Sequence, residues 1–226
     1  GLPRSRGNIR RRRCVTQSSS RSRGDEPERI PDEEVTMKRA DTAIPVHEFI
    51  AERWSPRSFD PTHVLDPEQA LALMEAARWA PSANNLQPWR FAIAHRGTPQ
   101  FDGFVATLNP GNNVWAPNAS ALILAAAVTK TPEGKDNHSA RYDLGLAVSL
   151  LTVQAHAMGL HVHQMGGFDR ANVASDLALA DDIAPVVILA VGRVASPEQL
   201  DTPFLEREVS VRQRHPLSEL VLFGLD

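Results

Sequence analysis

The stretch Arg78-Trp79-Ala80-Pro81-Ser82-Ala83-Asn84-Asn85-Leu86-Gln87-Pro88-Trp89-Arg90-Phe91 predicts a helix, a polar turn and a strand in direct succession. The helix should begin directly after Asp66, which suits the N-cap position, and should end at the residue before Pro81. Beyond Pro88, large apolar residues alternate as in a strand. The turn, residues 82–87, is rich in hydroxyl and amide groups. Such a turn can serve structure alone, or it can bind a polar ligand edge.

The composition suits a globular domain. A length of 226 residues with 42% hydrophobic residues allows one well-buried α/β domain, or two very small ones. No run approaches the roughly 18 apolar residues of a membrane-spanning helix. The single cysteine, Cys14, provides neither a disulfide framework nor a thiolate metal cluster. Any redox chemistry must therefore come from a bound cofactor.

Residues 1–36 differ from the rest of the chain and are expected to form a disordered basic tail. They hold nine arginines against six acidic residues, a net charge of +3, whereas residues 37–226 are net −6. Three interpretations stay open: an organellar transit segment, a basic arm for nucleic acid or anionic lipid, or a stretch outside the native protein. We favour the last, because Met37 would make a normal start. The acidic body argues against a nucleic-acid-binding domain.

The segment Arg53-Trp54-Ser55-Pro56-Arg57 combines two guanidinium groups with a hydroxyl group. Pro56 favours an extended conformation at Ser55, and alternate residues of an extended segment share one face. Arg53, Ser55 and Arg57 can therefore converge on one oxyanion or phosphate. Taken alone the pattern is weak, since arginines that face solvent are common.

Together, Ala80–Trp89 and Arg53–Arg57 resemble the motifs of the FMN-dependent nitroreductase family, and the resemblance extends over roughly Val46–Leu220. It implies an α+β, nitroreductase-like three-layer fold, with a central mixed β-sheet flanked by helices and a domain-swapped-type homodimer. It also implies FMN as the cofactor and NADPH or NADH as a transient electron donor. The folded domain would comprise residues 37–226.

The resemblance also implies which residues bind the cofactor. The first arginine motif would hold the phosphate and pyrimidine edge of FMN, and a basic pair near the C-terminus would complete the phosphate site. An asparagine after the expected helix 98–107 would reach the flavin ring; Asn112 is favoured, and its neighbour Asn113 stays open. A strand end with paired glycines would pass over one face of the flavin. The expected residues are Arg53, Trp54, Ser55, Arg57, Pro81, Ser82, Ala83, Asn85, Asn112, Gln164, Met165, Gly166, Gly167, Arg212 and Arg214.

Other elements are expected from local patterns. Residues 121–128, 161–165 and 185–192 read as strands, and 170–177 as a helix capped by Asp169. Residues 141–158 form a long helix that is apolar nearly all round, so we expect it to be buried, and the resemblance places it in a dimer interface. His161 and His163 share a strand face, but the lack of further ligands nearby favours no metal site.

The resemblance implies a ping-pong mechanism in which NAD(P)H delivers hydride to the flavin, leaves, and is replaced by an oxidised acceptor such as a nitroaromatic compound or a quinone. No side chain is expected to be catalytic, because the flavin carries the hydride; Arg57 is the candidate cation at its N1/O2 edge. The same fold also supports dehalogenation, flavin destruction, and enone or semialdehyde reduction. A non-catalytic flavin-binding protein is a further alternative. We expect a cytoplasmic homodimer with a small-molecule substrate and with neither nucleic acid nor membrane as a partner.

Overall fold

The computed structural model describes residues 38–224, so the expectations for the tail at residues 1–36 lie outside the described residues. The described residues belong to a single compact unit. Its strands are β1 (Trp89–His95), β2 (Ala121–Val128), β3 (His161–Met165) and β4 (Ile183–Gly192). Its α-helices are α1 (Glu48–Ala51), α2 (Pro67–Arg78), α3 (Pro99–Thr107), α4 (Pro110–Asn113), α5 (Ala140–Ala157), α6 (Arg170–Asp176), α7 (Phe204–Val209) and α8 (Leu217–Leu220).

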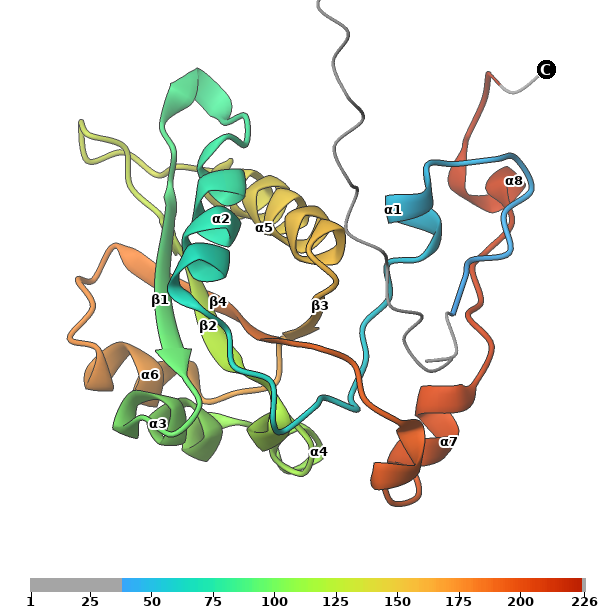
Figure 1. The fold of residues 1–226 in the computed structure, drawn as a ribbon. Coiled ribbons are helices and arrows are strands. Elements are labelled where there is room, and N and C mark those ends of the chain that lie inside the picture. The colour runs from blue at the N-terminus through green and yellow to red at the C-terminus, as the bar shows by residue number, and fades with distance from the viewer. Residues whose placement is uncertain (1–37, 225–226) are drawn as a thin grey trace, which may run out of the picture. The chain divides into compact units, whose positions relative to one another are not determined.

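The four strands form one sheet in the order β1-β2-β4-β3 (Figure 1). Every pairing between these strands is antiparallel, which corrects the expectation of a mixed sheet. The reason lies in the position of β4. Strands β2 and β3 run in the same direction and are joined through α5, but β4 lies between them and runs the opposite way. The two parallel strands therefore never pair with each other.

The sheet has a helical layer on each face, which confirms the three-layer α+β arrangement. Alternate residues of β2 separate the two layers, because successive side chains of a strand point to opposite faces. Ile123 and Ala125 belong to the core formed with α2 and α5. Leu122 and Leu124 belong to the core formed with α3 and α6. Since β2 is buried on both faces, its continuous apolar sequence is explained.

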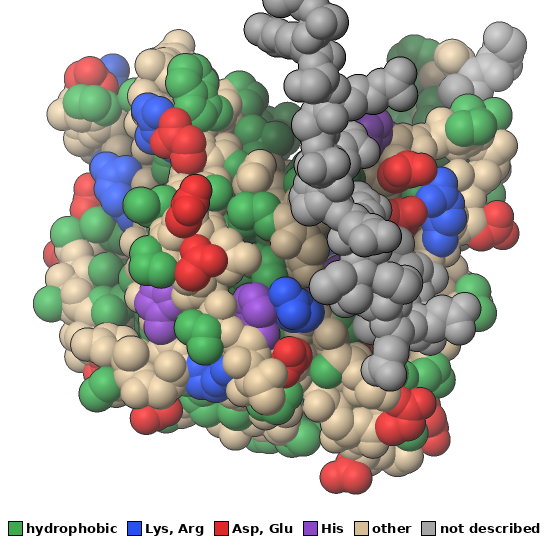
Figure 2. All heavy atoms as spheres, in the orientation of Figure 1, with side chains coloured by type: hydrophobic (Ala, Val, Ile, Leu, Met, Phe, Trp, Pro, Cys, Tyr) green, Lys and Arg blue, Asp and Glu red, His purple; other side chains and the backbone are tan. Residues whose placement is uncertain are grey.

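The helix that leads into the polar turn begins as expected. Asp66 caps α2 and forms a reciprocal capping box with Gln69, and Pro67 is its first residue. Leu73 and Ala77 are buried, whereas Leu71 is 70% exposed. The helix ends at Arg78. Figure 2 shows acidic side chains over the surface that carries α2, which fits the acidic net charge of the body.

Helix α5 is buried on one face only in the single chain. Leu144, Val148 and Leu151 pack into the core, while Leu150 on the opposite face is 38% exposed. Gly159 follows with a φ of 73°, the left-handed conformation expected of a glycine after a helix C-terminus. Within residues 38–224, no helix is long and apolar enough to cross a membrane.

Candidate functional site

Three of the expected arginines influence one another electrostatically. Arg53 Nη1 lies 3.5 Å from Ser55 Oγ, to which it donates. Burial, followed by the charge of Arg214, lowers the pKa of Arg53. Burial, followed by the charges of Arg53 and Arg214, lowers the pKa of Arg212. Two segments about 160 residues apart in sequence are thus brought together, and their clustered positive charge favours an anion.

The two C-terminal arginines differ in their surroundings. Arg212 Nη1 donates to the carbonyl oxygens of Ala51 at 2.7 Å and Lys38 at 2.8 Å, and so ties the C-terminal segment to the end of α1. Arg214 is exposed, and its Nη1 donates to the carbonyl of its neighbour Gln213 at 2.7 Å. Arg212 therefore has a structural role that sequence reasoning missed, whereas Arg214 is held by a local contact.

Arg57 is held by a residue that the sequence analysis did not select. The carboxylate of Glu208 accepts hydrogen bonds from the main-chain N–H of Arg57 at 2.9 Å and of Ser58 at 3.0 Å. Arg57 Nη1 lies 3.9 Å from Glu208 Oε2. Glu208 is only 2% exposed, although the two glutamates around Arg207 suggest a solvated face. Glu206 and Arg207 are exposed as that pattern predicts, and no local signal distinguishes Glu208 from them.

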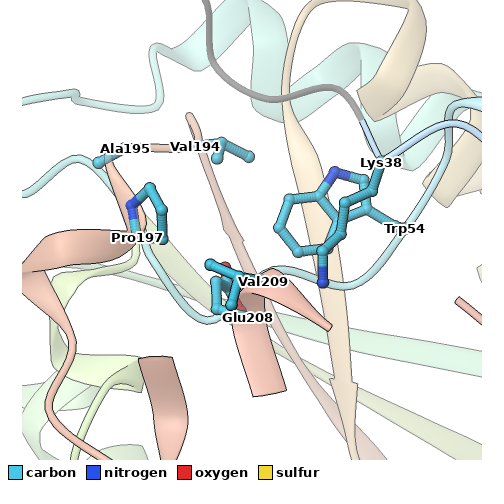
Figure 3. Close-up of a pocket in the computed structure, with 7 residues that line it drawn as sticks. All are labelled: Lys38, Trp54, Val194, Ala195, Pro197, Glu208 and Val209. Carbon is cyan, nitrogen blue, oxygen red and sulfur yellow. The ribbon is translucent and has the colours of Figure 1, made fainter. Parts of the chain in front are cut away.

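Trp54 lies at a pocket of about 430 Å³ that is partly open to solvent. Lys38 Nζ lies 4.9 Å from the centroid of the Trp54 ring, and Figure 3 shows its side chain running across that ring. On its other side Trp54 meets His161 edge to face, with ring centroids 6.0 Å apart. The pocket is lined by Lys38, Trp54, Val194, Ala195, Pro197, Glu208 and Val209. Within the arginine segment, the side chain of Trp54 is thus largely buried.

The glycine segment after β3 contacts helix α4, which contains Asn112. Asn112 Nδ2 donates to the carbonyl of Gly167 at 3.3 Å, whereas Asn113 Nδ2 donates to the carbonyl of Val105 at 2.8 Å. Of the two neighbours, Asn112 is therefore the one directed to the glycines. A Cβ at Gly167 would lie 2.7 Å from Asn109 Nδ2, so a larger residue there would have to displace the Asn109 side chain.

The other members of this segment differ in what they can offer. Gly166 has open space where a Cβ would stand, and its carbonyl accepts from Arg170 Nη2 at 2.9 Å. Gln164 is exposed at the end of β3. Met165 is 1% exposed and its side chain belongs to the core with α3 and α6. Only the main chain of Met165 can therefore contact a ligand.

The polar turn after α2 is held in an uncommon conformation. Asn84, Asn85 and Gln87 have φ values of 51°, 55° and 47°, a region that residues other than glycine seldom occupy. The N–H of Ala83 donates to Asp143 Oδ2 of α5 at 3.1 Å, and Asp143 is 2% exposed. Residues in sparsely populated backbone regions often cluster at functional sites. Sequence reasoning missed Asp143.

Within a single chain, the polar turn at residues 82–87 lies apart from the arginine cluster. Figure 1 shows the turn between the end of α2 and the start of β1, well separated from the segment that follows α1 and from α7. The expected site residues therefore fall into three groups, of which the first two adjoin each other, because His163 Nδ1 of β3 lies 2.8 Å from the carbonyl oxygen of Pro56. Arg53, Trp54, Ser55, Arg57, Arg212 and Arg214 form one; Asn112, Gln164, Met165, Gly166 and Gly167 form a second; Pro81, Ser82, Ala83 and Asn85 form a third.

The two strand histidines are both partly buried, but differ in their partners. Burial lowers the pKa of His163 to about 4. Its Nδ1 lies 2.8 Å from the carbonyl oxygen of Pro56, a residue of the arginine segment, and can donate a hydrogen bond to it. Burial, followed by the charges of His156 and Arg53, lowers the pKa of His161 to about 4. Among the described residues neither ring nitrogen of His161 has a hydrogen-bond partner. Residues 38–224 contain no group of three or more His, Cys, Asp or Glu side chains placed to hold a metal ion.

The fold is a three-layer α+β arrangement, and Arg53, Arg212 and Arg214 cluster near the hydroxyl of Ser55. The model of the Nitroreductase family matches residues 50–100 and 98–193, more than half of the chain. The chain belongs to this family.

Individual proteins are similar to much of this chain. An uncharacterized 15.4 kDa protein of Mycolicibacterium smegmatis is 32% identical over 146 residues, which is 60% of this chain and 95% of the relative. "Putative NAD(P)H nitroreductase YdgI" of Bacillus subtilis is 25% identical over 185 residues, 66% of this chain and 88% of its own. A solved structure of an oxidoreductase containing FMN has a TM-score of 0.77 at 35% identity, covering 82% of this chain and 94% of its own.

Proposed function

We propose that this protein is an FMN-dependent NAD(P)H oxidoreductase that reduces nitroaromatic compounds, quinones or related oxidised small molecules in two half-reactions. Family membership and relatives that contain FMN or carry an NAD(P)H nitroreductase name support the cofactor and the class of enzyme. The observation that carries the proposal is the cluster of Arg53, Arg212 and Arg214 beside the hydroxyl of Ser55. Clustered guanidinium groups with a hydroxyl suit the phosphate of FMN.

The residues present fit such a cofactor in two further respects. Gly166 allows the main chain to approach a flat ring, because nothing lies within 4 Å of the position where its Cβ would stand. Asn112 is held against the glycine segment, from which it can reach the same ring. When bound, FMN supplies the group that accepts and donates hydride.

The side chains have positioning and electrostatic roles in this proposal. Arg53, Ser55, Arg212 and Arg214 hold the phosphate, and Arg57 places a cation at the N1/O2 edge of the ring, where it favours the reduced, anionic form. Burial lowers the pKa of Arg57, while the neighbouring Glu208 raises it. No side chain is required as a nucleophile.

We also propose that the site is shared between two copies of the chain. The turn with Pro81, Ser82, Ala83 and Asn85 lies apart from the arginines of its own chain (Figure 1). The same turn of a second copy can complete the site. Exposed apolar residues of the C-terminal segment support an additional partner surface: Val211 is 83% exposed, Leu222 94% and Phe223 89%.

The proposal is tested on the purified full-length protein. We expect a yellow protein whose flavin, released by heat, is identified as FMN by chromatography. Under anaerobic conditions NADPH or NADH should bleach the flavin absorbance, and a nitroaromatic compound or a quinone should restore it. A protein that stays colourless after incubation with FMN contradicts the proposal. A bound flavin that neither nucleotide reduces would favour the non-catalytic flavin-binding alternative.

A further inference from the structure

The buried carboxylate of Glu208 joins two segments that are about 150 residues apart in the sequence. It lies in the last turn of α7 and is 2% exposed. Its Oε1 accepts from the N–H groups of Arg57 and Ser58 at 2.9 and 3.0 Å, and its Oε2 lies 3.0 Å from the N–H of Arg57. Burying a carboxylate is costly unless hydrogen bonds compensate for the lost hydration. Two main-chain donors and the nearby Arg57 guanidinium provide that compensation.

The carboxylate also lies among several cations. The charge of Glu208 raises the pKa values of both Lys38 and Arg57, opposing the lowering that burial causes. Arg57 and Arg212 in turn repel Lys38, whose pKa they lower. Replacing the carboxylate with a neutral group would therefore leave these cations to repel one another without compensation.

Helix α7 leads directly to the C-terminal arginines. Only a few residues separate Glu208 from Arg212 and Arg214, and Arg212 is fixed by its bonds to Lys38 and Ala51. In the segment that Glu208 contacts, Arg57 follows Arg53 by four positions. Any shift of α7 relative to this segment changes the spacing between the two arginine groups.

We infer that Glu208 is a positioning residue of the cofactor site, which holds the Arg53–Arg57 segment in register with Arg212 and Arg214. This inference rests on the proposed function, because it assumes that the two arginine groups bind one FMN phosphate. Glu208 itself is not a ligand in this role: its carboxylate is occupied by main-chain donors. It acts by fixing where the arginines stand.

The test is a double-mutant cycle on the full-length protein freed of flavin, with the dissociation constant of FMN measured from the quenching of its fluorescence. Glu208→Gln should raise the dissociation constant about tenfold or more, because it loses the charged acceptor. Arg214→Ala should raise it by about tenfold to a hundredfold in the wild-type background but less than about threefold in the Glu208→Gln background. Arg214→Ala should have the smaller effect in the Glu208→Gln background because Arg214 is then already displaced relative to Arg53.

Glu206→Gln is the matched control, since it removes the same charge from an exposed position of α7. It should leave the dissociation constant unchanged. Equal affinities of Glu208→Gln and wild type would overturn the inference. Effects of Glu208→Gln and Arg214→Ala that simply multiply would also overturn it, because that is what a structural role without register control predicts.

If Glu208→Gln yields no folded protein, Glu208→Asp replaces it in the cycle. This variant keeps the charge but is one methylene too short to reach both N–H groups. It should raise the dissociation constant of FMN as Glu208→Gln does, and it should likewise reduce the effect of Arg214→Ala. A wild-type protein that binds no FMN would contradict the proposed function and this inference together. A wild-type protein that binds FMN, with variants whose effects multiply, would contradict this inference alone.

Discussion

The side-chain amide of Asn112 donates to the carbonyl oxygen of Gly167 at 3.3 Å, across 55 residues of sequence. This contact joins α4 to the glycine segment after β3. The N–H of Asn109 also donates to the carbonyl of Gly167, at 3.0 Å. Two asparagines thus hold the glycine segment in one position.

Gly167→Ala is expected to disturb this contact, because the added Cβ would lie 2.7 Å from Asn109 Nδ2. We expect a lower melting temperature of the flavin-free protein, by a few degrees for a cost of about 1–3 kcal/mol. Gly166→Ala is the matched control, since nothing lies within 4 Å of its Cβ position. That control should keep the stability of the flavin-free protein. Equal melting temperatures of the two variants would contradict the argument from packing.

Arg214→Ala should weaken FMN binding by about 1.5–3 kcal/mol, the range for a hydrogen bond to a charged group. Fluorescence titration of the flavin-free protein measures the change. Riboflavin, which lacks the phosphate, provides the control: its affinity should be the same for the variant and the wild type. A loss that is equal for FMN and riboflavin would show that Arg214 does not bind the phosphate.

Leu150→Asp should disrupt the proposed homodimer. Leu150 lies on the outer face of α5 and is 38% exposed in the single chain. In an interface the new carboxylate would be buried without a partner, at a cost of several kcal/mol. Analytical ultracentrifugation should show a shift from dimer to monomer, while Val64→Asp, which adds the same charge at a 71% exposed position, should remain a dimer. A wild-type protein that binds FMN as a monomer would refute the shared site.

The partly buried His161 should make folding stability depend on pH. Burial, followed by the charges of His156 and Arg53, lowers its pKa to about 4, while Glu52 faces the neighbouring His156. The unfolded chain, in which a histidine has a pKa of about 6.5, then binds the proton more readily than the folded protein. Stability is complete above about pH 6.5 and is lost as the pH falls towards 4, by roughly 3 kcal/mol.

His161→Phe tests this origin of the pH dependence. The variant keeps an aromatic ring against Trp54, cannot be protonated, and removes two ring nitrogens that have no partner among the described residues. Its unfolding free energy in urea should fall less than that of the wild type between pH 6.5 and 4. His138→Phe, at an exposed loop position, should retain the wild-type profile. An unchanged profile for His161→Phe would assign the pH dependence to other groups.

Local sequence determined the elements whose formation depends on near neighbours. Asp66 and Pro67 set the start of α2, because a capping side chain and a fixed φ act within one turn. The apolar run at residues 121–128 gave the doubly buried strand, and Asp169 accepts from the N–H groups of Ala171 and Asn172 as the expected cap of α6. The family resemblance also followed from sequence, since the spacing of its motifs is local.

Tertiary structure alone decided the relationships between distant segments. The position of β4 between β2 and β3 made every strand pairing antiparallel, and no local pattern encodes which strands become neighbours. Asn112 contacts Gly167 whereas its neighbour Asn113 contacts Val105, and only the packing of the two segments sets that difference. Glu208 differs from the exposed Glu206 only because the main chain of Arg57 and Ser58 reaches it from about 150 residues away. A buried charge needs partners that folding must bring to it, so its role cannot be inferred before those partners are in place.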